Sequence, residues 1–71
     1  MYQFKRKEVL PIFLKRRITL RRLAKEAGVT EKTVERAVNG LPVQAVVVDR
    51  IAVALGVDPL DVLVENGVEI R

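Results

Sequence analysis

The chain has 71 residues and a formal net charge of +4, and it contains neither cysteine nor histidine. This length suits one small domain around one core, so we expect a single domain over residues 1–71. The two missing residue types exclude disulfides, thiolate chemistry, histidine acid/base catalysis and the usual zinc ligand sets.

The basic residues are concentrated in the first third of the chain. Residues 1–22 hold eight basic residues and one acidic residue, whereas residues 23–71 hold five basic and eight acidic residues. A molecule polarised in this way can turn a basic end toward a polyanion such as nucleic acid. An ordinary soluble surface has a similar composition, so charge alone leaves both interpretations open.

Apolar spacing predicts helices through most of the chain. Val9, Ile12 and Phe13 follow the i, i+3, i+4 spacing, and Pro11 fits only in a first turn, so the first helix is expected from about Leu10 to Arg17. Charged residues before Val9 leave no secretory signal pattern. Since apolar runs such as Ala45-Val46-Val47-Val48 are only a few residues long, we expect no membrane span and a cytoplasmic location.

A second helix is predicted between Thr19, a suitable N-cap, and Gly28, which would end it. Its apolar face would carry Leu20, Leu23, Ala24 and Ala27, and its polar face Arg21, Arg22 and Lys25.

A third helix is predicted from Glu31 to about Val38, capped by Thr30 and ended by Asn39-Gly40. On a helical wheel its two faces differ sharply. The inner face would hold Val34, Ala37 and Val38, and the outer face Lys32, Arg36 and Asn39, with Glu35 at its edge. A lysine and an arginine four residues apart repel weakly in an isolated helix, so this outer face suits an anionic partner.

Two further helices complete the predicted fold. The fourth is expected from about Val43 to Leu55, and the fifth, capped by Asp58 before Pro59, through about Val64. The core side of the fourth helix would consist of Ala45, Val48, Ile51, Ala52 and Leu55. The fold class is therefore all-α, a compact bundle of about five short helices.

The two chain ends allow alternatives. A helix that ends at Gly67 could be followed by a short strand over 68–70 that lies beside the N-terminus. A hairpin from Val62 to Ile70 would instead abolish the fifth helix.

The link between the second and third helices is only Gly28-Val29-Thr30, and small Ala24 and Ala27 precede it. Such a link predicts the steep packing of a helix-turn-helix, which props the second helix of the pair outward. An α-helix presented in this way fits the major groove of B-DNA.

The residues resemble a known family. The stretch Thr19 to Thr30, then Thr33-Val34, Asn39-Gly40 and Ile51 to Asp58, which contains Ala54-Leu55-Gly56-Val57, is similar to the phage-repressor-like helix-turn-helix family of the Xre/Cro type. The resemblance covers roughly residues 9 to 64, and it implies a lambda-repressor-like fold and DNA binding. The segment from Gly28 to Gly40 also resembles the lac-repressor headpiece, which lacks the upstream helix.

The resemblance implies particular DNA contacts. Base readers would be Glu31, Lys32, Thr33 and Arg36, and phosphate contacts would come from Leu20-Arg21 and Asn39-Gly40. Leu20 stands where the family often has glutamine, which removes one polar contact, so Arg21 or Arg22 would have to supply that contact. Leu41-Pro42 replaces a loop that is commonly polar, so we expect fewer phosphate contacts there. The candidate DNA-binding residues are Arg21, Arg22, Thr30, Glu31, Lys32, Thr33, Arg36 and Asn39.

Each candidate also has a purely structural interpretation. Glu31 favours the helix dipole, and Asn39 is a common residue of a helix-terminating turn. Lys32 and Arg36 suit any solvated face, and Thr33 fits either the helix surface or a contact with a thymine methyl group or a phosphate.

A departure from the family lies in the predicted core. Many members place an arginine in the first helix against a glutamate just before Asn-Gly, and the matching residues here are Phe13 and Val38. Exchanging a buried ion pair as a unit for an apolar contact can be neutral or stabilising, because two desolvation costs disappear. We therefore expect Phe13 to contact Val38 in the core.

The sequence thus predicts a sequence-specific binder of double-stranded DNA, a small transcriptional regulator or repressor that acts as a homodimer on DNA. It gives no sign of an enzyme, cofactor, metal or small-molecule ligand. The alternative is a protein-interaction module, such as an antitoxin-like partner of another protein. That alternative is favoured by apolar residues off the predicted core, namely Leu41, Val46, Val47 and Val53.

Overall fold

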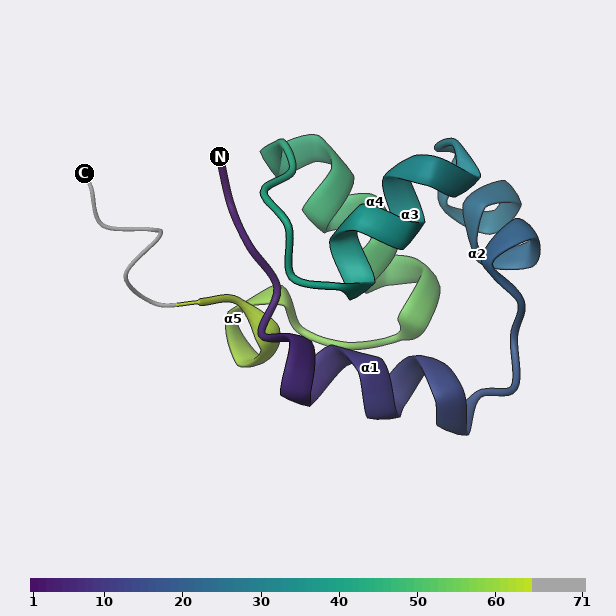
Figure 1. Cartoon of the computed structure of the whole chain (residues 1–71), viewed down its shortest axis with the longest axis horizontal. Helices are drawn as coiled ribbons and strands as arrows, with labels where there is room; N and C mark the ends of the chain where they lie inside the picture. The colour runs from purple at the N-terminus through teal and green to yellow at the C-terminus, as the bar shows by residue number, and fades with distance from the viewer. Residues whose placement is uncertain (65–71) are drawn as a thin grey trace.

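The structure is a computed structural model that describes residues 1–64, and these residues form five α-helices (Figure 1). The helices are α1 (Arg6–Lys15), α2 (Leu20–Ala27), α3 (Glu31–Val38), α4 (Ala45–Leu55) and α5 (Pro59–Val62). The predicted all-α class is confirmed. None of the five helices is both long enough and apolar enough to cross a membrane.

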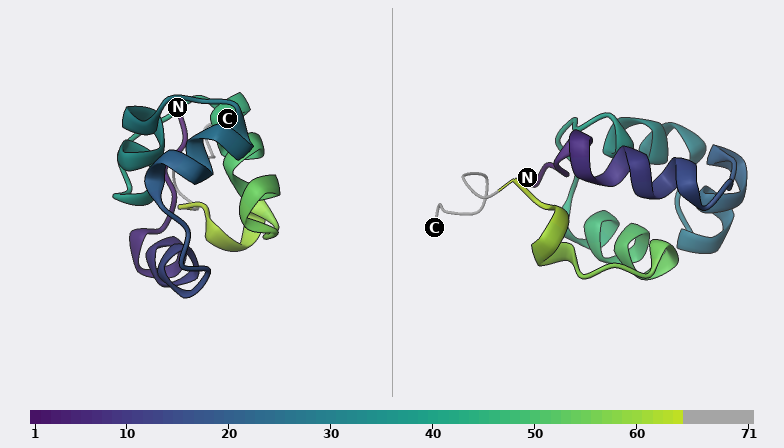
Figure 2. Two further views of the ribbon diagram at one scale, coloured as in Figure 1. Left: turned by 90° about the vertical axis from the view of Figure 1, so that its right-hand side faces the viewer. Right: turned by 90° about the horizontal axis from the view of Figure 1, so that it is seen from below.

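The helices pack around one core. α2 contacts both α3 and α4, α1 contacts α3, and α4 contacts α5. Figure 2 shows α1 lying along one side of the body that the other helices form. The largest fully buried side chains come from the N-terminal segment and from four different helices: Phe4, Val9, Leu23, Val34 and Ile51.

The helix boundaries that depend on local signals are confirmed. The Thr19 hydroxyl accepts a hydrogen bond from the backbone N–H of Arg22 (3.0 Å), and the Asp58 carboxylate accepts one from Leu60 N–H (2.9 Å). Gly28 and Gly56 end their helices in the left-handed conformation, each with φ of 74°. Both glycines release the chain from a helix at the predicted residue.

The start of the first helix was predicted wrongly. α1 begins at Arg6 instead of about Leu10, which places Pro11 in the helix interior. An interior proline costs about 3 kcal/mol, since it provides no N–H and crowds the preceding turn. Val9 and Phe13 are buried on either side of Pro11, and burying two such side chains contributes about 1.5–3 kcal/mol each. Their burial offsets the proline.

Two other boundaries differ because the N-terminal segment pairs with the rest of the chain. Tyr2 forms an antiparallel bridge with Val43, so α4 begins at Ala45 and not at Val43. Phe4 forms a second bridge, with Leu63, so α5 ends at Val62 and not at Val64. The predicted core side of α4 is confirmed except for Ala45, which lies exposed in the first turn.

α5 is present, as the first alternative for the C-terminal end requires. The helix end at Gly67, the strand over 68–70 and the outer part of the Val62-to-Ile70 hairpin lie outside the described residues.

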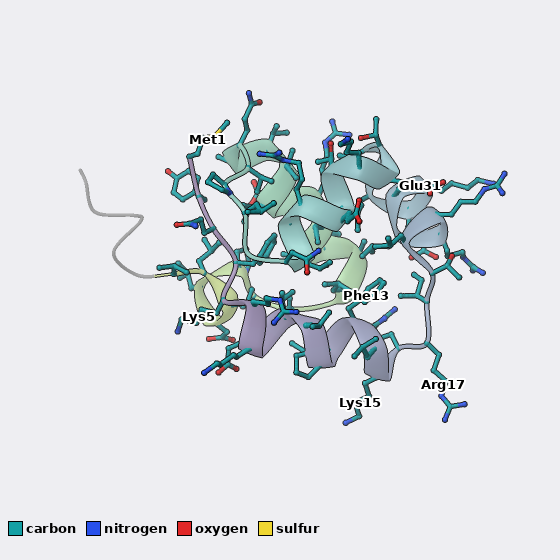
Figure 3. The ribbon with its side chains drawn as sticks, viewed as in Figure 1. Met1, Lys5, Phe13, Lys15, Arg17 and Glu31 are labelled. Carbon is teal, nitrogen blue, oxygen red and sulfur yellow. The ribbon has the colours of Figure 1, made fainter. Side chains whose placement is uncertain are left out.

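Phe13 and Val38, the predicted apolar replacement for an ion pair, are both buried. Phe13 on α1 and Val38 on α3 are 8% and 3% exposed and belong to the same core cluster. Figure 3 shows Phe13 pointing from α1 into the body of the domain. Two buried apolar side chains therefore occupy the positions where the resemblance implies charged residues.

Arg17 has an unusual backbone. It follows the C-cap of α1 with φ of 53°, and it is the one non-glycine residue with positive φ among residues 1–64. We expect Arg17→Gly to stabilise the domain by up to about 1 kcal/mol, because glycine adopts this conformation without a Cβ clash. Lys7→Gly, in the first turn of α1, relieves no positive φ and should instead destabilise, by no more than about 1 kcal/mol. Urea denaturation of both variants checks the opposite signs, and a loss of stability in both would contradict the prediction.

Candidate nucleic-acid interface

The turn between α2 and α3 is tightly built. The N–H groups of Gly28 and Val29 both donate to the Ala24 carbonyl, at 2.9 and 3.0 Å, which closes the end of α2. A Cβ on Gly28 would stand 2.9 Å from the guanidinium nitrogen Nη1 of Arg50 on α4. Since Ala24 and Ala27 are buried and small, α2 and α3 pack closely and the angle between them is fixed.

The predicted division of α3 into two faces is confirmed. Val34, Ala37 and Val38 are buried against the core. The opposite face is exposed and carries Glu31, Lys32, Glu35, Arg36 and Asn39. The helix therefore has an apolar side that anchors it and a polar side that is free to contact a partner.

The two threonines at the start of α3 bond to each other. The Thr30 hydroxyl accepts a hydrogen bond from the Thr33 N–H (3.1 Å), and the two hydroxyl oxygens lie 2.8 Å apart. This geometry makes Thr30 the N-cap of α3, and we assign it that role before DNA contact. Thr33 is half-buried whereas Thr30 is exposed, so the Thr33 side chain lies closer to the body of the domain. Glu31, in the first turn, is exposed at the corner where α2 and α3 meet (Figure 3).

Arg36 occupies the middle of the exposed face of α3. It borders two shallow hollows, one on each side of the helix. The first is lined by Lys32, Glu35, Arg36, Asn39 and Leu41, and the second by Thr33, Arg36, the loop after α3 and the first turn of α4. A long guanidinium at this place is accessible from both sides.

The two arginines at the start of α2 differ in their contacts. Arg22 forms an exposed ion pair with Glu26 one turn later (Nε to Oε2, 3.0 Å). Arg21 is exposed and makes no side-chain hydrogen bond to any other residue of the described chain, 1–64. Arg21 is thus the better placed of the two to bind an external anion.

Asn39 joins α3 to a residue that the sequence analysis missed. Its side-chain amide donates to the Glu35 carbonyl (2.8 Å), which satisfies a carbonyl at the end of α3. Its amide oxygen lies 3.5 Å from Nε of Arg6, the first residue of α1. The sequence signal for this residue is the basic run Lys5-Arg6-Lys7 alone, because apolar spacing predicts a first helix that begins after it.

The basic residues of the N-terminal third do not gather at one end of the molecule. Lys5 precedes α1 and Arg17 follows it, so they lie at opposite ends of that helix. Lys15 points away from α3 (Figure 3). The cations of α1 therefore lie along the length of that helix and do not form a single basic end, and the polarisation of the whole molecule stays a prediction.

One of three comparisons with known proteins identifies a family. A family model described as a Cro/C1-type HTH DNA-binding domain matches residues 12–66. No curated protein and no solved structure matches the chain. The matched range contains α2, the turn and α3 in full, and it begins inside α1, after Arg6.

Proposed function

Since the chain belongs to the Cro/C1-type helix-turn-helix DNA-binding family, we propose that it is a sequence-specific binder of double-stranded DNA and a transcriptional repressor that acts in the cytoplasm. The observation that carries the proposal is the exposed face of α3, with Lys32 and Arg36 held outward while Val34, Ala37 and Val38 anchor the helix. A helix presented in this way enters the major groove with its N-terminal turns toward the bases.

The side chains of this face suit base reading. Arg36 and Lys32 can donate to O6 and N7 of guanine, and an arginine does so with two parallel hydrogen bonds. Glu35 can accept from N4 of cytosine. Glu31 stands in the first turn of α3, where its charge favours the helix dipole, so we assign it to helix stability before base reading.

Arg21 would hold a backbone phosphate without reading sequence. We expect Arg21→Ala to weaken binding to every duplex alike and to lower the salt slope of log K by about 0.9, the value for one lost phosphate contact on B-DNA. Gel shifts with wild type and variant at several salt concentrations measure this slope. Lys15→Ala removes the same charge from a side chain that points away from α3, and it serves as the control. A loss confined to one duplex would contradict the phosphate assignment.

A homodimer is the form in which we expect the protein to bind. Val46 and Val53 are seven residues apart on α4, on one stripe of the helix that also carries the exposed Asp49 and Arg50 between them, and the two valines are 51% and 80% exposed. Burying this stripe between two copies would remove apolar surface from water and present two recognition helices to half-sites one helical turn apart.

The same stripe favours a second candidate, binding of another protein, as an antitoxin-like module would do. Gel shifts at two salt concentrations distinguish the candidates. A DNA binder loses affinity steeply as salt rises. The absence of a shift on any duplex would favour the protein-interaction module.

A further inference from the structure

The N-terminal segment, residues 1–5, packs against the loop that follows α3. It runs beside the loop after α3 and meets α5 (Figure 1). Tyr2 and Val43 exchange two backbone hydrogen bonds of 2.8 Å, and the Lys5 N–H donates to the Val62 carbonyl. Phe4 is 1% exposed in the core. The segment is thus an ordered part of the domain, although it lies outside the family match.

These contacts fix the position of Arg6 against the end of α3. The Gln3 side-chain amide donates to the Gly40 carbonyl (3.1 Å). A Cβ on Gly40 would stand 3.4 Å from both the Arg6 Cβ and the Phe4 carbonyl oxygen, and Gly40 has φ of 82°. Such a close approach leaves the start of α1 little freedom to move relative to Asn39-Gly40.

The guanidinium of Arg6 makes one side-chain contact and keeps hydrogen-bond donors free for a partner. Its Nε faces the Asn39 amide oxygen at 3.5 Å, and Asn39 is itself held by the Glu35 carbonyl. An arginine has five N–H donors, so this contact leaves the four on the terminal nitrogens free. The single ion pair among residues 1–64 joins Arg22 and Glu26, so within that range no carboxylate neutralises Arg6.

The location also suits an anion that flanks the groove. An eight-residue helix such as α3 rises about 12 Å, which is about the width of the major groove. A helix that enters with its N-terminal turns therefore has its C-terminal end near backbone phosphates. That end carries partial negative charge, which would repel a phosphate unless a cation such as Arg6 stands beside it.

We propose that Arg6 binds a DNA backbone phosphate at the C-terminal end of α3, oriented by Asn39. This inference rests on the proposed function. It makes the N-terminal segment part of the DNA interface, because the pairing of Tyr2 and Phe4 with the body of the domain positions Arg6.

The test compares Arg6→Ala with wild type and with the control Lys15→Ala. The probes are a duplex selected by the wild type and a scrambled duplex of about 20 base pairs, which holds two half-sites. Losing one phosphate contact should lower the salt slope by about 0.9 per protomer and weaken binding about eightfold per protomer at 0.1 M salt, on both duplexes. Lys15→Ala should change the slope less. Arg6→Lys should keep most of the slope, since it keeps the charge.

The outcomes separate this inference from the proposed function. If wild type binds and Arg6→Ala has the salt slope of Lys15→Ala, the Arg6 assignment is overturned while DNA binding stands. If wild type shows no salt-sensitive binding to any duplex, the proposed function fails and this inference fails with it. Circular dichroism melting reports on folding, and Arg6→Gln, which keeps much of the side-chain stem, replaces Arg6→Ala if the alanine variant melts early.

Discussion

Val38→Glu should lower the free energy of unfolding by about 3–5 kcal/mol, the cost of an unpaired buried charge. Val38 is 3% exposed on the buried face of α3, so a carboxylate there would lose its water without gaining a partner. A domain of 71 residues is stable by about 4–11 kcal/mol at 0.05–0.15 kcal/mol per residue. Val38→Glu is therefore expected to lose a large part of the stability of the domain, which urea denaturation measures as a lower midpoint concentration.

Adding Phe13→Arg should recover a substantial part of that loss. Phe13 lies in the same core cluster as Val38, and the two substitutions together would restore the arginine–glutamate ion pair that the family resemblance implies. Leu41→Glu, at an exposed position, controls for adding the charge and should change stability by no more than about 0.5 kcal/mol. If the double variant is no more stable than Val38→Glu alone, the two sites do not form a replaceable pair.

Arg36→Ala should cost about 1–3 kcal/mol of binding free energy on the preferred duplex and should relax preference at one base position. The reason is that a bidentate contact with guanine is lost while contacts to other bases remain. Lys32→Ala should relax a different position. Arg36→Lys keeps the charge but loses the two-pronged geometry, so it separates base reading from charge attraction.

Competition binding with single-base variants of the preferred duplex measures these losses. Arg21→Ala provides the contrast, because a phosphate contact should affect all duplexes alike. Equal, sequence-independent losses for Arg21, Lys32 and Arg36 would remove the assignment of α3 as the base reader.

Local sequence signals predicted the parts of the fold that local chemistry decides. Thr19, Thr30 and Asp58 cap helices as expected, and Gly28 ends α2 where predicted. The apolar spacing of Val34, Ala37 and Val38 identified the buried face of α3, and hence the face left for a partner. The helix-turn-helix could be predicted because its caps and its turn are close together in the sequence.

The errors arise from contacts between distant residues. α1 tolerates Pro11 because Val9 and Phe13 of the same helix are buried in the core, and no local rule reports that burial. The late start of α4 follows from the bridge between Tyr2 and Val43, residues far apart in sequence. Arg6 was missed for the same reason, since its contact with Asn39 spans 33 positions.

Selection of bound sequences from a random duplex library with the wild-type protein tests the central claim most directly. If α3 reads bases in the major groove of DNA, the selected duplexes should share a motif made of two symmetry-related half-sites, with centres about 10 base pairs or a multiple apart. Bound duplexes without any shared sequence, or no bound duplexes at all, would contradict that claim.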